Sequence, residues 1–595
     1  MSDKRAGERG QGRVIRGASV VDGSGAPAFR GDIGIQDGRI DFVAKADGSG
    51  PRTTRTPDIS GREIIDAEGL VLTPGFVDPH THYDAQLGWD PTASPSNLHG
   101  VTTVIGGNCG FSIAPLGDDD ADYIRRMMSV VEGMPLEALE GGLDWSWRSF
   151  GSWLDGLEGQ TAVNAGFLVG HCALRRTVMG ARSVGGYAND GEIEAMATLL
   201  KESIEGGGLG LSSSRSFTHR DGDGKPVPSR HASEEELLTL CDVTGGLEGT
   251  TLEFITDGCL QGFTDEEVDL MTRMSLRAGR SLNWNVFTID STEPDRFANQ
   301  LRAQETAAEK GAQVVALTMP TLVGMTMSFL TYSPIHQLPG WNDVLSLPFE
   351  QRMAALRKPE VRKALLAGAH SPEAGVFARV ADFPNFRIGK THSEANVGLS
   401  GRLVKEIAAE RGADDFDTLI EIVLADRLQT VLWPDPPDND AASWELRRKA
   451  WENGHTLLGG SDAGAHLDRM CGAPYTTDFL ADCIRGRKLW PLERAVQALT
   501  DRPAQLFGLI ERGRIETGFH ADLVLFDPET IGSGEIHERF DLPGNSARLF
   551  AESTGIRRVF VNGEPIVVDG RATDARPGTI LRSGRDTRTV SIGGG

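Results

Sequence analysis

The chain has 595 residues and a formal net charge of −24. A nucleic-acid-binding role is therefore disfavoured, since it needs a concentrated positive surface. Hydrophobic residues make up 39% of the sequence without forming a run long enough to span a bilayer, so we expect no membrane-spanning role.

At this length, one large catalytic-sized domain and at least one smaller unit are expected. The N-terminal segment "MSDKRAGERGQGRV" is polar and has no apolar core of a secretory signal. It predicts a disordered tail at residues 1–13 and a cytoplasmic protein.

Both ends of the chain contain short β-like runs broken by turn dipeptides. Residues 14–73 include "RVIRGASVVDG" and "EIIDAEGLVLTPG", and residues 509–595 include "HADLVLFDP" and "IRRVFVNGEPIVVDG". Such runs are typical of strands joined by tight turns. We therefore predict one small β-sandwich built from both ends, with residues 74–508 inserted between its two parts.

Between these ends, short apolar strands alternate with helical patterns. Helices are predicted at 190–207 and 232–246, and the second has a Ser-x-x-Glu start. About eight strand–helix units are expected, with strands at 70–77, 101–107, 162–171, 208–214, 249–258, 281–290, 311–320 and 455–464. This α/β pattern predicts a closed parallel barrel, in which chemistry occurs at the C-terminal ends of the strands.

One segment interrupts the alternation. Residues 321–390 are rich in proline and aromatic side chains. We interpret them as an insertion, either covering the mouth of the barrel or forming a surface excursion without a role in the active site.

His80 and His82 follow the first predicted barrel strand in "GLVLTPGFVDPHTH". Side chains two residues apart on a strand point to the same side, so the two imidazoles can share one metal ion. Asp462, in "GGSDAGAH", ends the last apolar strand. A carboxylate there can ligate a metal and also accept a proton from water.

Two histidines on strand one and an aspartate on strand eight resemble the amidohydrolase superfamily, which implies a distorted TIM (β/α)8 barrel with a small β-sandwich. "HGVTTVIGGNCGFSIAPL", "LVGHCALRRTVMG" and "LERAVQALTDRPAQLFGL" resemble its D-aminoacylase (N-acyl-D-amino-acid deacylase) branch. In that branch a cysteine at the position of Cys109 is a metal ligand. The resemblance covers nearly the whole chain from about residue 14.

The chain departs from that branch at two strands. The branch supplies metal-binding histidines on strands five and six, where this sequence reads "TTLEFITDG" and "LNWNVFTID". Three alternatives remain open: Glu253 replaces an imidazole, His392 reaches the site from elsewhere, or His80, His82, Cys109 and Asp462 hold the metal alone. Asn283 and Asn285 are weak ligands at best.

Other polar residues near strand ends are candidates for substrate binding. His171 ends strand three, where substrate contact and structural hydrogen bonding are both open. His466 and Arg469 follow Asp462, where the branch places groups that meet a substrate carboxylate; a solvated arginine is the alternative. His392 is also included, and His219 and His231 are left unassigned.

The resemblance implies a metal-dependent hydrolase of amide C–N bonds, with an N-acyl D-amino acid as substrate. The metal is expected to be zinc, as one or two ions, and a homo-oligomer is left open. Hydrolysis of a cyclic amide, urea or carbamate is the alternative within enzymes, because fold does not fix substrate. A non-catalytic barrel that binds ligands is the alternative of another class.

Overall fold

The structure is a computed structural model that describes residues 12–46, 59–331, 333–436 and 438–592. The predicted tail at residues 1–13 therefore lies almost wholly outside the described residues. The described chain divides into two compact units. The first comprises residues up to 321, 445–467 and 472 onward, and the second comprises 322–444 and 468–471.

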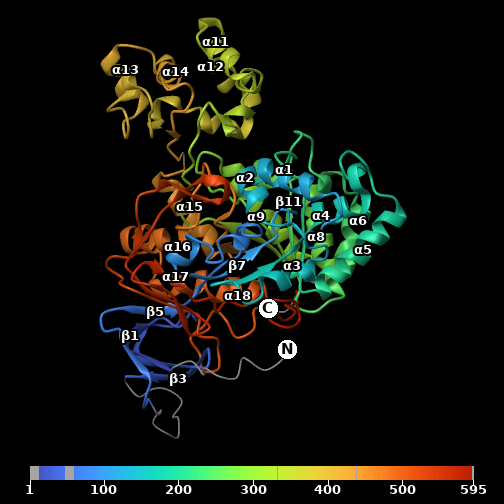
Figure 1. Ribbon diagram of the computed structural model, residues 1–595, viewed down its shortest axis with the longest axis vertical. Helices are drawn as coiled ribbons and strands as arrows, with labels where there is room; N and C mark the ends of the chain where they lie inside the picture. Colours follow the sequence, from blue (N-terminus) through green and yellow to red (C-terminus); the bar gives the residue numbers. More distant parts are fainter. Residues whose placement is uncertain (1–11, 47–58, 332, 437, 593–595) are drawn as a thin grey trace. The chain divides into compact units, whose positions relative to one another are not determined.

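Both ends of the chain contribute strands to one nine-stranded sheet (Figure 1). The N-terminal strands are β1 (Arg13–Val20), β2 (Phe29–Gln36), β3 (Arg39–Lys45), β4 (Glu63–Asp66) and β5 (Val71–Pro74). The C-terminal strands are β17 (Leu523–Phe526), β22 (Ile556–Val561), β23 (Glu564–Val568) and β24 (Arg571–Ala572). Their order is β24-β23-β22-β17-β5-β1-β2-β3, and β4 pairs with β1. The predicted union of the two ends is thus seen in the antiparallel pairing of β5 with β17.

This sheet is stabilised by apolar side chains from both ends. Ile15, Ile33 and Leu72 pack in one cluster with Leu523 and Leu525, all fully or almost fully buried. Burying such a side chain contributes roughly 1.5–3 kcal/mol, so the two halves of the sheet depend on each other.

The sheet leads directly into the barrel. Only Gly75 separates β5 from β6 (Phe76–Asp78), the first barrel strand. A Cβ atom at Gly75 would lie 2.1 Å from the hydroxyl oxygen of Thr102. Glycine is required because the neighbouring barrel strand approaches the backbone closely there.

The strands of the distorted TIM (β/α)8 barrel form two parallel sheets. The first sheet has the order β6-β7-β8 and the second β16-β13-β12-β11-β10-β9. Their bounds are β7 (Val101–Gly106), β8 (Asn164–Phe167), β9 (Val169–Gly170), β10 (Gly210–Ser214), β11 (Thr251–Ile255), β12 (Leu282–Trp284), β13 (Val314–Thr318) and β16 (Thr456–Leu458). Leu168 alone separates β8 from β9, and a parallel bridge pairs Thr81 with Ala463 beyond β6 and β16.

The helices of this unit follow the barrel strands in chain order. They are α1 (Ala121–Val131), α2 (Leu136–Gly141), α3 (Phe150–Leu157), α4 (His171–Met179), α5 (Asp190–Glu205), α6 (Glu234–Gly245), α7 (Gly258–Gln261), α8 (Asp265–Ala278), α9 (Pro294–Glu309), α16 (Tyr475–Asp478), α17 (Leu492–Leu499) and α18 (Asp501–Leu506). The helices predicted at 190–207 and 232–246 are α5 and α6. The hydroxyl of Ser233 caps α6 by accepting a hydrogen bond from Glu236 N.

The second unit has a core of its own. Trp341, Phe383 and Phe416 pack against one another, with the rings of Trp341 and Phe383 stacked at 5.4 Å. Its elements are α10 (Trp341–Leu345), α11 (Phe349–Leu356), α12 (Pro359–Ala369), β14 (Arg387–Ile388), α13 (Val404–Arg411), α14 (Asp415–Ala425) and β15 (Leu432–Trp433). Apart from residue 321, the insertion predicted at 321–390 falls within this unit, and its role at the barrel mouth stays a prediction.

The remaining strands and α-helix of the described chain are β18 (Gly532–Ser533), β19 (His537–Leu542), β20 (Ser546–Phe550), β21 (Ser553–Thr554) and α15 (Ala441–Glu452). Helix α15 begins in the second unit and ends in the first. No helix of the described chain is both long and apolar enough to cross a membrane.

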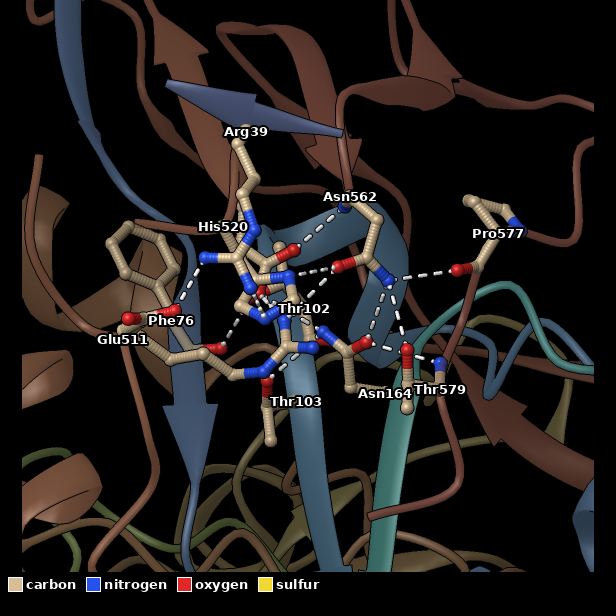
Figure 2. Close-up of polar contacts among 12 residues, drawn as sticks. Arg39, Phe76, Thr102, Thr103, Asn164, Glu511, His520, Asn562, Pro577 and Thr579 are labelled. Carbon is tan, nitrogen blue, oxygen red and sulfur yellow. Dashed lines mark hydrogen bonds and ion pairs between the residues drawn. The ribbon is translucent and has the colours of Figure 1, made fainter. Parts of the chain in front are cut away.

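A buried polar network joins the sheet to the start of barrel strand β8 (Figure 2). Asn164, the first residue of β8, donates to the Asp522 carboxylate at 3.1 Å and accepts from the Asn562 side chain at 3.1 Å. Asn562 N also donates to Asp522, at 2.7 Å. Arg512 forms an ion pair with the same carboxylate, and both side chains are almost fully buried. The network lies at the N-terminal end of β8, away from the end where barrel chemistry occurs.

Replacing Asp522 with alanine is expected to lower the free energy of unfolding by about 3–5 kcal/mol, because Arg512 would become an uncompensated buried charge. Denaturant unfolding measures this, with Asp574→Ala, at an exposed position, as the matched control. Equal stability of the two variants would contradict the prediction.

Candidate metal centre

The two histidines of the HxH motif lie just beyond β6 and are fully buried. His82 N donates to the carbonyl oxygen of Ala463 at 2.7 Å, which ties the motif to the end of strand eight. The two rings are 5.3 Å apart in a T-shaped arrangement. Nε2 of His80 and Nε2 of His82 lie 3.7 Å and 3.1 Å from the same oxygen of Asp462. Both imidazoles therefore point toward the Asp462 carboxylate.

Cys109 follows β7 and reaches the same two imidazoles. Its Sγ lies 3.6 Å from His80 Nε2, and ligand atoms of Cys109, His80 and His82 lie within 4.8 Å of one another. The backbone of Cys109 has a φ of 55°. A left-handed conformation costs a non-glycine residue about 1–3 kcal/mol, so the surrounding chain must hold it.

Asp462 approaches from the opposite side, beyond β16. Its φ is 59°, and Asp462 N donates to His80 O at 3.2 Å. Its side chain is 27% exposed, whereas those of His80 and His82 are 1% and 0% exposed. Asp462 is therefore the most exposed of these three side chains.

The fifth and sixth strands supply Glu253 and Asn285 where imidazoles were expected. Glu253 is 1% exposed on β11, and neither of its carboxylate oxygens has a hydrogen-bond partner. Asn285 follows β12, with Nδ2 2.9 Å from His80 Nε2 and 3.5 Å from Cys109 Sγ. Asn283 instead donates to the carbonyl of Leu252. Of the two asparagines considered, only Asn285 contacts the cluster.

Burial dominates the pKa values of three of these groups. It lowers the pKa of His80 to about 3, helped by the charge of His82. It raises the pKa of Glu253 to about 8 and that of the Cys109 thiol well above its ordinary value. All three favour their neutral forms in the protein alone.

Charge pairing dominates the pKa values of His82 and Asp462. Burial acts to lower the pKa of His82, but Glu132 and Asp462 outweigh it and raise the value to about 10. Desolvation acts to raise the pKa of Asp462, but the close contact and charge of His82 hold it well below its usual range. Asp462 is therefore a carboxylate.

Glu132 and His219 were not recognised as site residues from the sequence. Glu132 follows α1, and its Oε2 lies 3.5 Å from His82 Nε2. His219 donates to or accepts from the Ser214 hydroxyl at 2.6 Å, and burial and the charges of His82 and His466 lower its pKa to about 3. Neither residue ends a strand. The segment "VVEGMP" contains no second metal-ligating residue at a recognisable spacing from Glu132, so the sequence carried no signal for it.

His171 has both ring nitrogens in internal hydrogen bonds. They contact the Ser213 hydroxyl and the Glu236 carboxylate, each at 2.8 Å, and His171 and Glu236 are fully buried. Arg175 pairs with the same carboxylate. Of the two roles considered for His171, these contacts favour structural hydrogen bonding over substrate contact.

The remaining candidates divide between the two units. His466 Nε2 lies 3.6 Å from Asp462 Oδ2, and its side chain is 26% exposed. Arg469 and His392 belong to the second unit, where Arg469 pairs with Asp468 and His392 is exposed. Their substrate-binding roles stay predictions. His231 ends a short 3-10 helix, with Nε2 buried and without a hydrogen-bond partner.

Comparison with known proteins places this centre in context. The chain is 28% identical to D-aminoacylase and 30% identical to N-acyl-D-aspartate deacylase, both from Alcaligenes xylosoxydans xylosoxydans. Each alignment spans 579 residues, which is 96% of this chain and 97% and 95% of the respective relatives. The crystal structure of D-aminoacylase superimposes with a TM-score of 0.61 at 25% identity, covering 96% of this chain and 99% of that one.

A zinc and phosphonate complex of N-acyl-D-glutamate deacylase from Bordetella bronchiseptica shares the fold, with a TM-score of 0.60 at 23% identity over 97% of this chain and 100% of that one. The family model for amidohydrolases matches residues 63–567. The motifs that indicated the D-aminoacylase branch are thereby confirmed, and the chain belongs to the amidohydrolase family.

Proposed function

We propose that this enzyme is a metal-dependent hydrolase that cleaves the amide bond of N-acyl amino acids, with D substrates preferred. The observation that carries the proposal is the convergence of His80, His82, Cys109 and Asp462 at the C-terminal ends of barrel strands. Relatives named D-aminoacylase and N-acyl-D-aspartate deacylase support the substrate class.

The residues fit a divalent cation. His82 Nε2 lies 3.1 Å from Asp462 Oδ1 and 3.5 Å from Glu132 Oε2, yet it is a buried atom without a hydrogen bond of good geometry. Both oxygens of Glu253 are also buried and unpaired. Buried polar groups are normally satisfied, so an unsatisfied imidazole nitrogen beside two carboxylates fits a cation.

His80, His82, Cys109 and Asp462 would hold the ion, with Glu253 in place of the strand-five imidazole. Imidazole, thiolate and carboxylate are the ligands that zinc prefers, and zinc is present in the N-acyl-D-glutamate deacylase complex. When bound, zinc acts as a Lewis acid toward a carbonyl oxygen and lowers the pKa of water.

Asp462 would act as the general base and then as the acid. Its low pKa keeps the carboxylate ionised, and the side chain is partly exposed. The carboxylate accepts a proton from the attacking water and passes it to the leaving nitrogen, which departs as the free amine of the amino acid. His466, beside Asp462, would contact the substrate carboxylate.

The substrate class is tested with purified protein supplied with zinc, manganese or cobalt. Release of free amino acid is measured for N-acyl-D- and N-acyl-L-amino acids, and a cyclic amide and a carbamate are assayed by loss of substrate. We expect the N-acyl-D compounds to react fastest. Turnover of only the cyclic amide or the carbamate would instead assign the alternative C–N hydrolase activity.

Asp462→Asn is expected to lower kcat/KM by roughly 10²–10⁴-fold, the range typical of a lost general acid–base group, while the fold is retained. Circular dichroism and steady-state kinetics check this, with Asp482→Asn, at an exposed position, as the control. Retention of most activity in Asp462→Asn would refute the assigned base.

The double variant His80→Ala and His82→Ala is expected to lose bound metal, because two imidazole ligands disappear together. Metal content measured by inductively coupled plasma mass spectrometry after extensive dialysis tests this. A double variant as rich in metal as the wild-type protein would show that the ion is held elsewhere.

A further inference from the structure

Glu132 is a buried carboxylate that the sequence motifs do not explain. It directly follows α1, and its side chain is 4% exposed. Its Oε2 lies 3.5 Å from His82 Nε2, which is longer than the 2.7–2.9 Å of a charge-assisted hydrogen bond. The contact is therefore too long for a tight ion pair, although both groups are buried.

The distances around His82 match those between ligands of one ion. Ligand atoms of His82, Glu132 and Asp462 all lie within 4.8 Å of one another. His82 Nε2 is 3.1 Å from Asp462 and 3.5 Å from Glu132. Nitrogen and oxygen ligands bound about 2.1 Å from a tetrahedral zinc ion are roughly 3–3.5 Å apart.

The backbone holds Glu132 at this place. Its carbonyl oxygen accepts a hydrogen bond from His466 N at 2.5 Å. The end of α1 is thereby tied to the segment that carries Asp462. Two carboxylates from different barrel loops are thus held beside the same imidazole nitrogen.

The charges around Glu132 agree with this geometry. The charged groups that act on Glu132 are His82, Asp462 and Asp84, and no lysine or arginine of the described chain is among them. Glu253 is influenced by His82 and Glu132. Several acidic groups therefore share one basic partner, His82. Buried carboxylates are costly unless they are paired or coordinate a metal, and a divalent cation would compensate them.

We propose that Glu132 is a metal ligand, which with His82 and Asp462 forms a position for one divalent cation. His82 Nε2 has one lone pair and binds one ion at a time, so this position and that of His80, His82 and Cys109 are alternative places for an ion that share His82. One imidazole and two carboxylates suit zinc and also the harder manganese ion. The inference rests on the metal dependence in the proposed function and not on its amide substrate.

The test compares full-length wild-type protein with Glu132→Gln. Both are stripped with a chelator, and zinc and manganese binding are measured by competition with a chromophoric chelator. Glu132→Gln is expected to weaken binding at one position by more than about tenfold, since even groups that only support a ligand are worth 10–100-fold. Glu140→Gln, at an exposed position, should bind as the wild-type protein does.

Melting temperatures separate a ligand from a structural partner of His82. If Glu132 is a ligand, the metal-free variant melts at or above the wild-type temperature, because one of the acidic groups crowded around His82 is gone, and the rise caused by added zinc shrinks. If Glu132 only pairs with His82, the metal-free variant melts lower and the zinc-induced rise is unchanged. That second result, or unchanged metal affinity, overturns the proposal.

Cobalt spectroscopy distinguishes the two positions. Replacement of zinc by cobalt gives a thiolate-to-cobalt absorption band if Cys109 is a ligand. Glu132→Gln should keep this band, and Cys109→Ser should lose it while retaining the other position.

If Glu132→Gln fails to fold, Glu132→His tests the same point, because imidazole is also a ligand and should preserve binding. Loss of both positions in Glu132→His would overturn the assignment. Because these measurements use no substrate, they remain informative if amide hydrolysis is not found.

Discussion

The pairing of the first and last barrel strands is the constraint on which the metal centre depends. The bridge between Thr81 and Ala463, and the hydrogen bond from Asp462 N to His80 O, bring together residues from opposite ends of the barrel sequence. Without that register, Asp462 would not face the two imidazoles. The backbone at Cys109, Asp462 and His466 is left-handed. The strand register is therefore maintained despite local backbone strain, which is common at functional sites.

The centre differs from the one implied by its motifs because carboxylate and amide groups replace two imidazoles. Glu253 is buried with both oxygens unpaired, and Asn285 donates toward His80 and Cys109. An added carboxyl group favours a harder metal ion, and an amide binds a soft cation weakly. These replacements, together with the ligand role proposed for Glu132, would shift the ligand set of the centre from nitrogen toward oxygen.

Regular periodicity and strand ends made much of this structure predictable. The HxH pair and Asp462 could be placed because their positions depend only on strand order and on a side-chain repeat of two. Glu132 could not, because it enters through the packing of α1 and a backbone contact with His466. Ser233 was predicted as a helix cap and is one, but the Glu236 carboxylate binds His171 and Arg175. Such long-range contacts leave no local trace in a sequence.

The union of the two chain ends in one sheet has a consequence for synthesis on the ribosome. Strand β5 emerges early, but its partner β17 is made several hundred residues later. At 5–20 residues per second the delay is on the order of tens of seconds. During that interval one side of β5 has no partner, and unpaired strand edges are sites of aggregation. The nascent chain must therefore be protected at its beginning until its end is complete.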